Sequence, residues 1–142
     1  MSMSPQSMAE VQQLIAGYAE YVDEGDLDGY ANQFTEDGVF ENRGGRLEGR
    51  EAIREWVASL IEAGRVGSKS SLRHVLGLPV IRGDDQQCTA RTYVMIPGMT
   101  ESGDVELPMV GTYRDTIVKV DGRWYFKQRS IVMDLASQSR ST

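Results

Sequence analysis

The chain of 142 residues carries 21 acidic and 15 basic side chains, which gives a formal charge of −6. This length predicts a single domain over residues 1–142, with a core at about 8–134 and frayed tails at 1–6 and 137–142. The acidic balance argues against nucleic acids and anionic membranes as partners, because both are bound through clustered Lys and Arg. One cysteine and one histidine cannot complete a zinc site, and no signal peptide or long apolar run is present. We therefore expect a cytoplasmic protein without a built-in metal.

The first part of the sequence has the period of amphipathic helices. Apolar side chains recur at steps of three and four from Met8 to Val22, which predicts a first helix. Gly25 is suited to a left-handed cap at its end, and Asp26 is suited to capping the start of the next helix. That short second helix is expected to carry Leu27, Tyr30 and Phe34. A third helix is predicted after Gly49, with a buried face made of Ile53, Trp56, Val57, Leu60 and Ile61.

The later part of the sequence changes to a period of two, which is typical of strands. A brief strand through Val39 and Phe40 is expected between the second and third helices. After a loop at 63–70, strands are predicted near 71–82, 87–97, 107–120 and 123–133, with turns at 83–85 and at Asp121-Gly122. Three helices followed by a curling antiparallel sheet predict an α+β fold in which the helices cover one face of the sheet.

His74 is the only histidine, and its position in a predicted strand directs it inward. Strand parity places it on one face with Leu72, Leu76, Leu78 and Val80. One interpretation is a core histidine satisfied by a backbone carbonyl. The other is a functional group whose pKa is set by burial and a neighbouring carboxylate.

Asp23 and Tyr18 are candidates for the same cavity. A carboxylate at Asp23, in the last turn of the first helix, faces the negative end of the helix dipole and is disfavoured there. It lies at the flank of the apolar stripe, where it is placed to lean over a pocket edge. Tyr18, one turn earlier, is placed to offer a phenol to that pocket. The alternatives are a solvated acidic turn for Asp23 and a core tyrosine for Tyr18.

The remaining polar and sulfur-containing residues are expected to have structural roles. Charged side chains on the last two strands are expected to form cross-strand ion pairs on the solvated face, and they are Arg114, Asp115, Arg123, Lys127 and Arg129. Met95, Met109 and Met133 suit an adaptable apolar pocket lining.

Five segments together resemble the SnoaL-like branch of the nuclear transport factor 2-like superfamily. They are YAEYVDEGDLD at 18–28, FTEDGVF at 34–40, GREAI at 49–53, GTYRD at 111–115 and VDGRW at 120–124. The resemblance covers about residues 8–134. It implies a cone-shaped α+β barrel, whose curved sheet and three helices enclose one deep, mostly apolar pocket.

The pair Asp23 and His74 resembles the Asp–His dyad of scytalone dehydratase and bile-acid 7α-dehydratase within that superfamily, and Tyr18 matches a tyrosine of the latter. The resemblance implies a cofactor-independent lyase or isomerase, a dehydratase by preference, that acts on a hydrophobic cyclic molecule. His74 would be the base, Asp23 would orient it, and Tyr18 would donate a hydrogen bond. The sequence departs from the bile-acid enzyme at Met133, where that enzyme has an arginine, and at Phe40, where it has a second tyrosine.

Two alternatives remain open at this point. The same pair could activate water or direct a ring closure, as in related cyclases and epoxide hydrolases. The protein could instead be a non-catalytic module for ligand binding or association, because this fold is reused without chemistry. The fold also implies a homo-oligomer, a dimer or trimer that covers the open face of the sheet.

Overall fold

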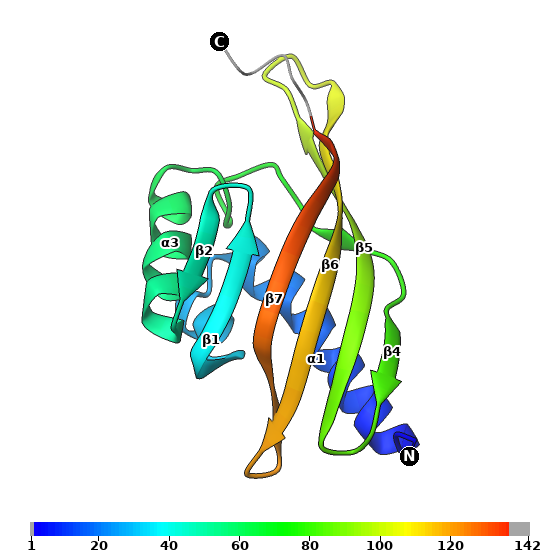
Figure 1. Ribbon diagram of the computed structural model, residues 1–142. Helices are drawn as coiled ribbons and strands as arrows, with labels where there is room; N and C mark the ends of the chain where they lie inside the picture. The colour runs from blue at the N-terminus through cyan, green and yellow to red at the C-terminus, as the bar shows by residue number, and fades with distance from the viewer. Residues whose placement is uncertain (1, 137–142) are drawn as a thin grey trace.

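The computed structural model describes residues 2–136, in which three helices precede most of a curved sheet (Figure 1). The helices are α1 (Pro5–Glu24), α2 (Leu27–Ala31) and α3 (Arg50–Glu62). The strands are β1 (Phe34–Asn42), β2 (Gly45–Glu48), β3 (Val75–Leu76), β4 (Val80–Gly83), β5 (Gln87–Met99), β6 (Val105–Val120) and β7 (Arg123–Ala136). The tail predicted at 137–142 lies outside the described residues.

The α1 helix begins earlier than its sequence period indicates. Pro5 is its first residue, and the Ser4 hydroxyl caps the helix by accepting the backbone N–H of Ser7 at 3.1 Å. The backbone N–H of Ser4 donates to Asp85 at 2.7 Å. The frayed tail expected over 1–6 is therefore wrong for Ser4 and Pro5, because a cap and a long-range hydrogen bond hold them.

The predicted junction between the first two helices is confirmed. Gly25 ends α1 in the left-handed region with φ of 77°, and Asp26 caps α2 by accepting the Gly29 N–H at 3.0 Å. The α2 helix is shorter than predicted. It ends at Ala31, and Phe34 is the first residue of β1 rather than a helical residue.

The α+β class is confirmed, and the sheet differs from the prediction in two details. The strand order is β2-β1-β7-β6-β5-β3, with β4 also paired to β5. The sheet is therefore open and does not close into the barrel that the resemblance implied. It is mixed rather than wholly antiparallel, because β1 runs parallel to β7. The long strands β6 and β7 are joined at the predicted Asp121-Gly122 turn, where both residues have positive φ. Figure 1 shows α1 crossing behind the long strands and α3 lying beside β1 and β2.

The single strand predicted near 71–82 is wrong. Only Val75–Leu76 and Val80–Gly83 are strands, and the chain between them contains Gly77 and Pro79, which interrupt the pattern. Leu78 is consequently 92% exposed instead of sharing an inner face with His74. Val80, placed on that face by parity, is also exposed.

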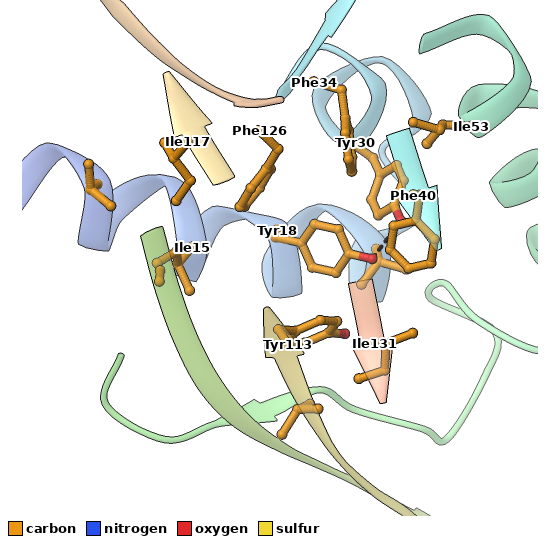
Figure 2. Packing of buried hydrophobic residues seen from close by; sticks show 14 of the residues in the cluster. Ile15, Tyr18, Tyr30, Phe34, Phe40, Ile53, Tyr113, Ile117, Phe126 and Ile131 are labelled. Atoms are coloured by element: carbon orange, nitrogen blue, oxygen red, sulfur yellow. Dashed lines mark hydrogen bonds between the residues drawn. The ribbon is translucent and has the colours of Figure 1, made fainter. Parts of the chain in front are cut away.

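The core fills the space between the concave face of the sheet and the helices. On β5, buried and exposed side chains alternate along the strand, as expected for a sheet with one covered face. Figure 2 shows aromatic rings from both layers packed together, with Tyr18 tilted against Tyr30 at 4.8 Å and Phe34 against Phe126 at 5.4 Å between ring centroids. This core forms the inner end of a pocket.

Candidate functional site

A pocket of about 400 Å³ opens between the helices and the concave face of the sheet. Most of its wall is apolar, and the apolar side chains come from both layers: they include Val22, Trp56, Leu60, Ile96, Met109 and Met133. Met95, the third methionine expected to suit the lining, instead lies on the outer face of β5 and is 44% exposed. A concave apolar pocket with a few polar groups is the usual form of a small-molecule site.

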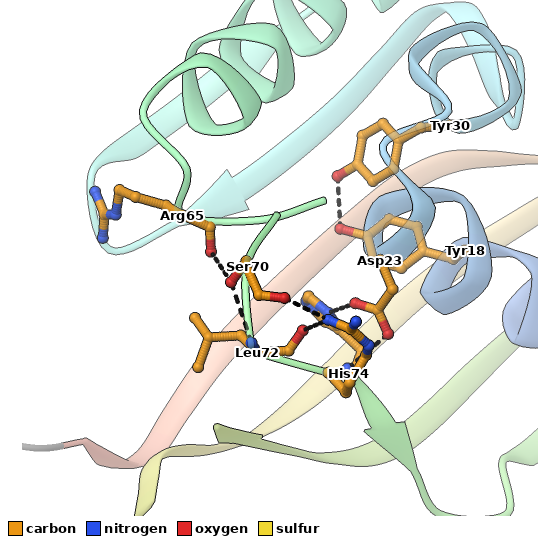
Figure 3. A network of polar contacts seen from close by, with 8 residues as sticks. Tyr18, Asp23, Tyr30, Arg65, Ser70, Leu72 and His74 are labelled. Atoms are coloured by element: carbon orange, nitrogen blue, oxygen red, sulfur yellow. Dashed lines mark hydrogen bonds and ion pairs between the residues drawn. The ribbon is translucent and has the colours of Figure 1, made fainter. Parts of the chain in front are cut away.

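The structure brings Asp23 and His74 into direct contact, although they are 51 positions apart in sequence. The ring Nδ1 of His74 lies 2.8 Å from Asp23 Oδ1, and the backbone N–H of His74 donates to Asp23 Oδ2 at 3.0 Å. The carboxylate therefore holds both the ring and the main chain of His74 (Figure 3). His74 lines the pocket, and its side chain is 9% exposed. Asp23, which was expected at the edge of the same cavity, is not part of the lining; it lies behind His74, and its side chain is 16% exposed.

Local hydrogen bonds fix the segment that carries His74. The Ser70 hydroxyl donates to the carbonyl of Arg65 at 3.2 Å and accepts the backbone N–H of Leu72 at 3.1 Å. The guanidinium of Arg73 donates to the carbonyls of Ser70 and Leu72, both at 2.7 Å. These bonds give the irregular chain before β3 a defined shape, as Figure 3 shows. His74 thus reaches Asp23 from a loop, which sequence parity could not have predicted.

Tyr18 lines the same pocket, as predicted, and it does so within a cluster of three tyrosines. Its hydroxyl lies 2.6 Å from that of Tyr30, and its ring meets the edge of Tyr113 at 5.5 Å between centroids. All three line the pocket. Tyr30 and Tyr113 were not identified as site residues from the sequence, because helical and strand periods mark them only as core positions.

Burial keeps these phenols neutral. It raises the pKa of Tyr18 well above its usual value, and the neighbouring Tyr30 phenol raises it further. Burial likewise raises the pKa of Tyr30 and Tyr113. The positive charge of Arg129 acts in the opposite direction on all three. The cluster therefore presents O–H donors to the pocket over the whole neutral range.

The ion pair expected between Asp115 and Arg129 on the solvated face is buried, which makes that assignment wrong. The two residues are directly opposite on β6 and β7, and both side chains have 0% exposure. Arg129 donates from Nε at 2.7 Å and from Nη2 at 3.1 Å to the two carboxylate oxygens. Burial raises the pKa of Asp115, and Arg129 opposes that rise. By contrast, Arg114, Arg123 and Lys127 are exposed as predicted, but within residues 2–136 none of them forms the expected ion pair.

Aromatic rings replace solvent around Arg129. The guanidinium carbon lies 3.8 Å from the ring centroid of Tyr113, 4.2 Å from that of Tyr18 and 4.4 Å from that of Phe126. Such faces attract a cation. Because Tyr18 and Tyr113 also form the inner wall of the pocket, the buried pair lies directly behind that wall.

Other candidate features were sought within residues 2–136. No group of three or more His, Cys, Asp or Glu side chains there is arranged to hold a metal ion. In the same part of the chain, no helix is long and apolar enough to cross a membrane.

Comparisons with known proteins agree with this architecture. An NTF2-like protein with a cystatin-like fold from Novosphingobium aromaticivorans superposes with a TM-score of 0.82 at 22% identity, over 94% of this chain and 85% of that one. A protein described as a candidate scytalone dehydratase from the same species gives a TM-score of 0.77 at 20% identity, over 93% and 87% of the two chains. At these identities the likeness shows the fold alone.

The sequence comparisons go further than the fold. Subunit beta 1 of the terminal oxygenase component of terephthalate 1,2-dioxygenase, from Comamonas sp, is 30% identical over 132 residues, which span 84% of this chain and 85% of that relative. The profile of the SnoaL-like domain matches residues 5–130. The chain therefore belongs to the SnoaL-like domain family.

Proposed function

We propose that the protein is a cofactor-independent lyase or isomerase, with dehydration as the preferred reaction, that acts on a hydrophobic cyclic molecule. The observation that carries this proposal is the contact between His74 Nδ1 and Asp23 Oδ1 at 2.8 Å on the wall of an apolar pocket. A titratable pair in such a pocket is the arrangement that proton abstraction from carbon requires.

His74 acts as the base. When its Nδ1–H donates to the carboxylate of Asp23, the lone pair resides on Nε2, which is the ring nitrogen left for the substrate. A proton next to a substrate carbonyl moves to Nε2, and its bonding electrons pass into an enolate. Asp23 stabilises the imidazolium that forms, and its second hydrogen bond, from the backbone of His74, prevents the ring from turning away.

The tyrosine cluster binds the oxygen on which negative charge develops. The 2.6 Å contact between Tyr18 and Tyr30 uses one of the two hydroxyl hydrogens, and the other remains available for the substrate oxygen. A neutral phenol is needed for this role, and the raised pKa of Tyr18 provides it. The surrounding apolar wall strengthens the hydrogen bond, because little water screens it.

Elimination completes the dehydration. The enolate electrons form the carbon–carbon double bond as the bond to a hydroxyl at the next carbon breaks. The imidazolium of His74 returns its proton to the departing oxygen, so water leaves and the base is regenerated. If the substrate has no such hydroxyl, return of the proton to another carbon gives isomerisation with the same residues.

The test follows cyclic β-hydroxy ketones of one to three rings by NMR in deuterated water. Wild-type protein is expected to produce the enone or to exchange the proton next to the carbonyl, and His74→Ala is expected to lose roughly 10²-fold or more of that rate. Glu55→Gln, at an exposed position of α3 outside the pocket lining, is the control and should be unchanged. Equal rates for wild type and His74→Ala would rule out the proposal, and a cyclised or hydrated product would indicate the related cyclase or hydrolase chemistry.

A second candidate function, association into an assembly, is favoured by the outer face of the sheet. Tyr93, Met95 and Val132 are 61%, 44% and 48% exposed on β5 and β7, and the Comamonas relative is itself a subunit of a larger oxygenase component. We propose that this face is covered by a second copy of the chain. Light scattering of purified protein should give a mass above that of one chain, and Tyr93→Glu should reduce it to the monomer. A monomeric wild type would exclude this arrangement.

A further inference from the structure

The mouth of the pocket is positively charged although the whole chain is negative. Arg43 and Arg65 line the pocket, and both are exposed, whereas Tyr18, Tyr113 and His74 at its inner end are largely shielded from solvent. Among the described residues, no Asp or Glu belongs to the lining. The formal charge of the whole chain is −6, so acidic side chains are more common than basic ones. An opening lined by two arginines and by no acidic residue is therefore unexpected for this chain.

These two arginines also differ from most other arginines of the protein. Arg46, Arg54 and Arg129 each bind a carboxylate. Arg50 and Arg73 donate to backbone carbonyls. Within residues 2–136, the guanidinium groups of Arg43 and Arg65 have neither kind of partner. Their donors are therefore available to a ligand that enters the pocket.

The backbone at both positions is held in place. Arg43 lies in a turn closed by Asn42, whose side-chain oxygen accepts the Gly44 N–H at 2.7 Å. The N–H of Arg65 donates to the carbonyl of Leu60 at 2.9 Å, and its own carbonyl accepts the Ser70 hydroxyl. The hydrogen bonds of Ser70 continue to the segment that carries His74. Figure 3 shows the Arg65 side chain directed away from the Asp23–His74 pair.

From this arrangement we infer that the pocket takes a hydrophobic ring compound that bears a carboxylate or another anionic group, which Arg43 and Arg65 bind at the mouth. Guanidinium groups bind carboxylates through paired hydrogen bonds, and their charge also attracts an anion from solution. The ring system then extends inward along the apolar wall to His74 and Tyr18. This inference rests on the proposed function, because it assigns the anion to the same substrate pocket.

The test measures binding rather than turnover, so it can fail independently of the proposed reaction. Fluorescence titration compares 6-hydroxy-2-naphthoate with its neutral analogue, 6-hydroxy-2-naphthamide, at low ionic strength. Wild type is expected to bind the carboxylate about tenfold or more tightly than the amide. Arg43→Gln and Arg65→Gln are each expected to reduce this ratio, and the double variant is expected to bring it close to one with the affinity for the amide unchanged.

Two matched controls locate the effect. Arg82→Gln removes the same charge from an exposed arginine on β4 that does not line this pocket, and it should leave the ratio unchanged. Arg114→Gln, at a second exposed arginine outside the lining, should also keep the ratio, since the inference assigns the anion to Arg43 and Arg65 alone. Equal affinity of wild type for the two probes, binding of neither, or a ratio that survives in the Arg43→Gln/Arg65→Gln double variant would overturn the inference. A protein that shows the ratio but no proton exchange from any ketone would retain this site and lose the proposed reaction.

Discussion

The protein contains two pairs of an aspartate with a nitrogen base, and they differ in solvent access. Asp115 and Arg129 are fully buried, joined by two hydrogen bonds and surrounded by aromatic rings. His74 lines the pocket and Asp23 holds it from behind, with one ring nitrogen of the histidine not bonded to the aspartate. The first pair does not reach the pocket, whereas the second reaches it through His74.

Under the proposed function, two properties separate the structural pair from the chemical one: access to the pocket, and a base that can take up and release a proton, since an arginine stays charged at neutral pH. A buried ion pair contributes little net stability relative to apolar packing, but the loss of one partner leaves an uncompensated charge. When one partner of a pair beside a pocket is substituted, water can reach the group that remains, so the loss of folding free energy is smaller. Substitution in the Asp115–Arg129 pair should therefore lower mainly stability, and substitution in the Asp23–His74 pair should lower mainly activity.

The largest expected effect is on stability, from Arg129→Met. The change leaves the Asp115 carboxylate buried without its cation and removes three aromatic contacts, so the free energy of unfolding should fall by about 3–5 kcal/mol. Urea denaturation measures it. Arg114→Gln, an exposed neighbour on β6, should change it by no more than about 0.5 kcal/mol. If the two variants were equally stable, the buried pair would not have the structural role described.

Asp23→Asn should affect activity more than stability. The amide can still accept one of the two hydrogen bonds, but its NH₂ group would face the other donor and favour the histidine tautomer with the proton on Nε2. The ring would then be blocked as a base, and the rate of proton exchange should fall roughly 10²-fold. The free energy of unfolding should change by only about 1 kcal/mol. An active Asp23→Asn protein would show that the carboxylate does not set the tautomer.

Gly25→Ala tests how much the left-handed cap at the end of α1 contributes to stability. The φ of 77° strains any residue with a Cβ atom, whereas the space around that atom is ordinary, with Gly67 Cα 3.6 Å away. The expected cost is about 1–2 kcal/mol, measured by thermal or urea unfolding. A loss below about 0.3 kcal/mol would mean that the cap relaxes freely.

The smallest expected effect concerns alkaline pH. Burial raises the folded-state pKa of Tyr18, so its contribution to stability is complete below the unfolded-state pKa of about 10 and declines as pH rises above it. At about pH 10.5 this amounts to about 0.8 kcal/mol. Tyr18→Phe should therefore lose less stability between pH 8 and 10.5 than wild-type protein, which retains the buried phenol. Identical losses would argue against a buried, neutral Tyr18.

The same contrast explains what the sequence could predict. Local signals sufficed for Gly25, Asp26 and the Asp121-Gly122 turn, since each depends on a few neighbouring residues. The α+β order of elements also follows from hydrophobic periods. The outcome at Arg129 could not be predicted, because charge alone places an arginine on the solvated face. Its burial depends on a partner on β6 and on rings from α1, β6 and β7.

For related reasons, only part of the candidate site could be predicted from the sequence. Strand parity and helix position marked His74 and Asp23 as candidates, and the resemblance paired them. Their contact depends on the loop of residues 70–74, whose hydrogen bonds are not encoded in a strand period. Tyr30 and Tyr113 have ordinary core positions in sequence, and only the three-dimensional packing places their rings beside Tyr18.

The most direct test of the central claim is the tautomer of His74, measured by long-range ¹H–¹⁵N NMR. The chain has one histidine, so its ring signals need no assignment. We predict that the neutral ring carries its proton on Nδ1, facing Asp23, and that Asp23→Asn moves the proton to Nε2. A neutral ring already protonated at Nε2 in the wild type would contradict the account, because the nitrogen facing the pocket would have no lone pair to act as a base.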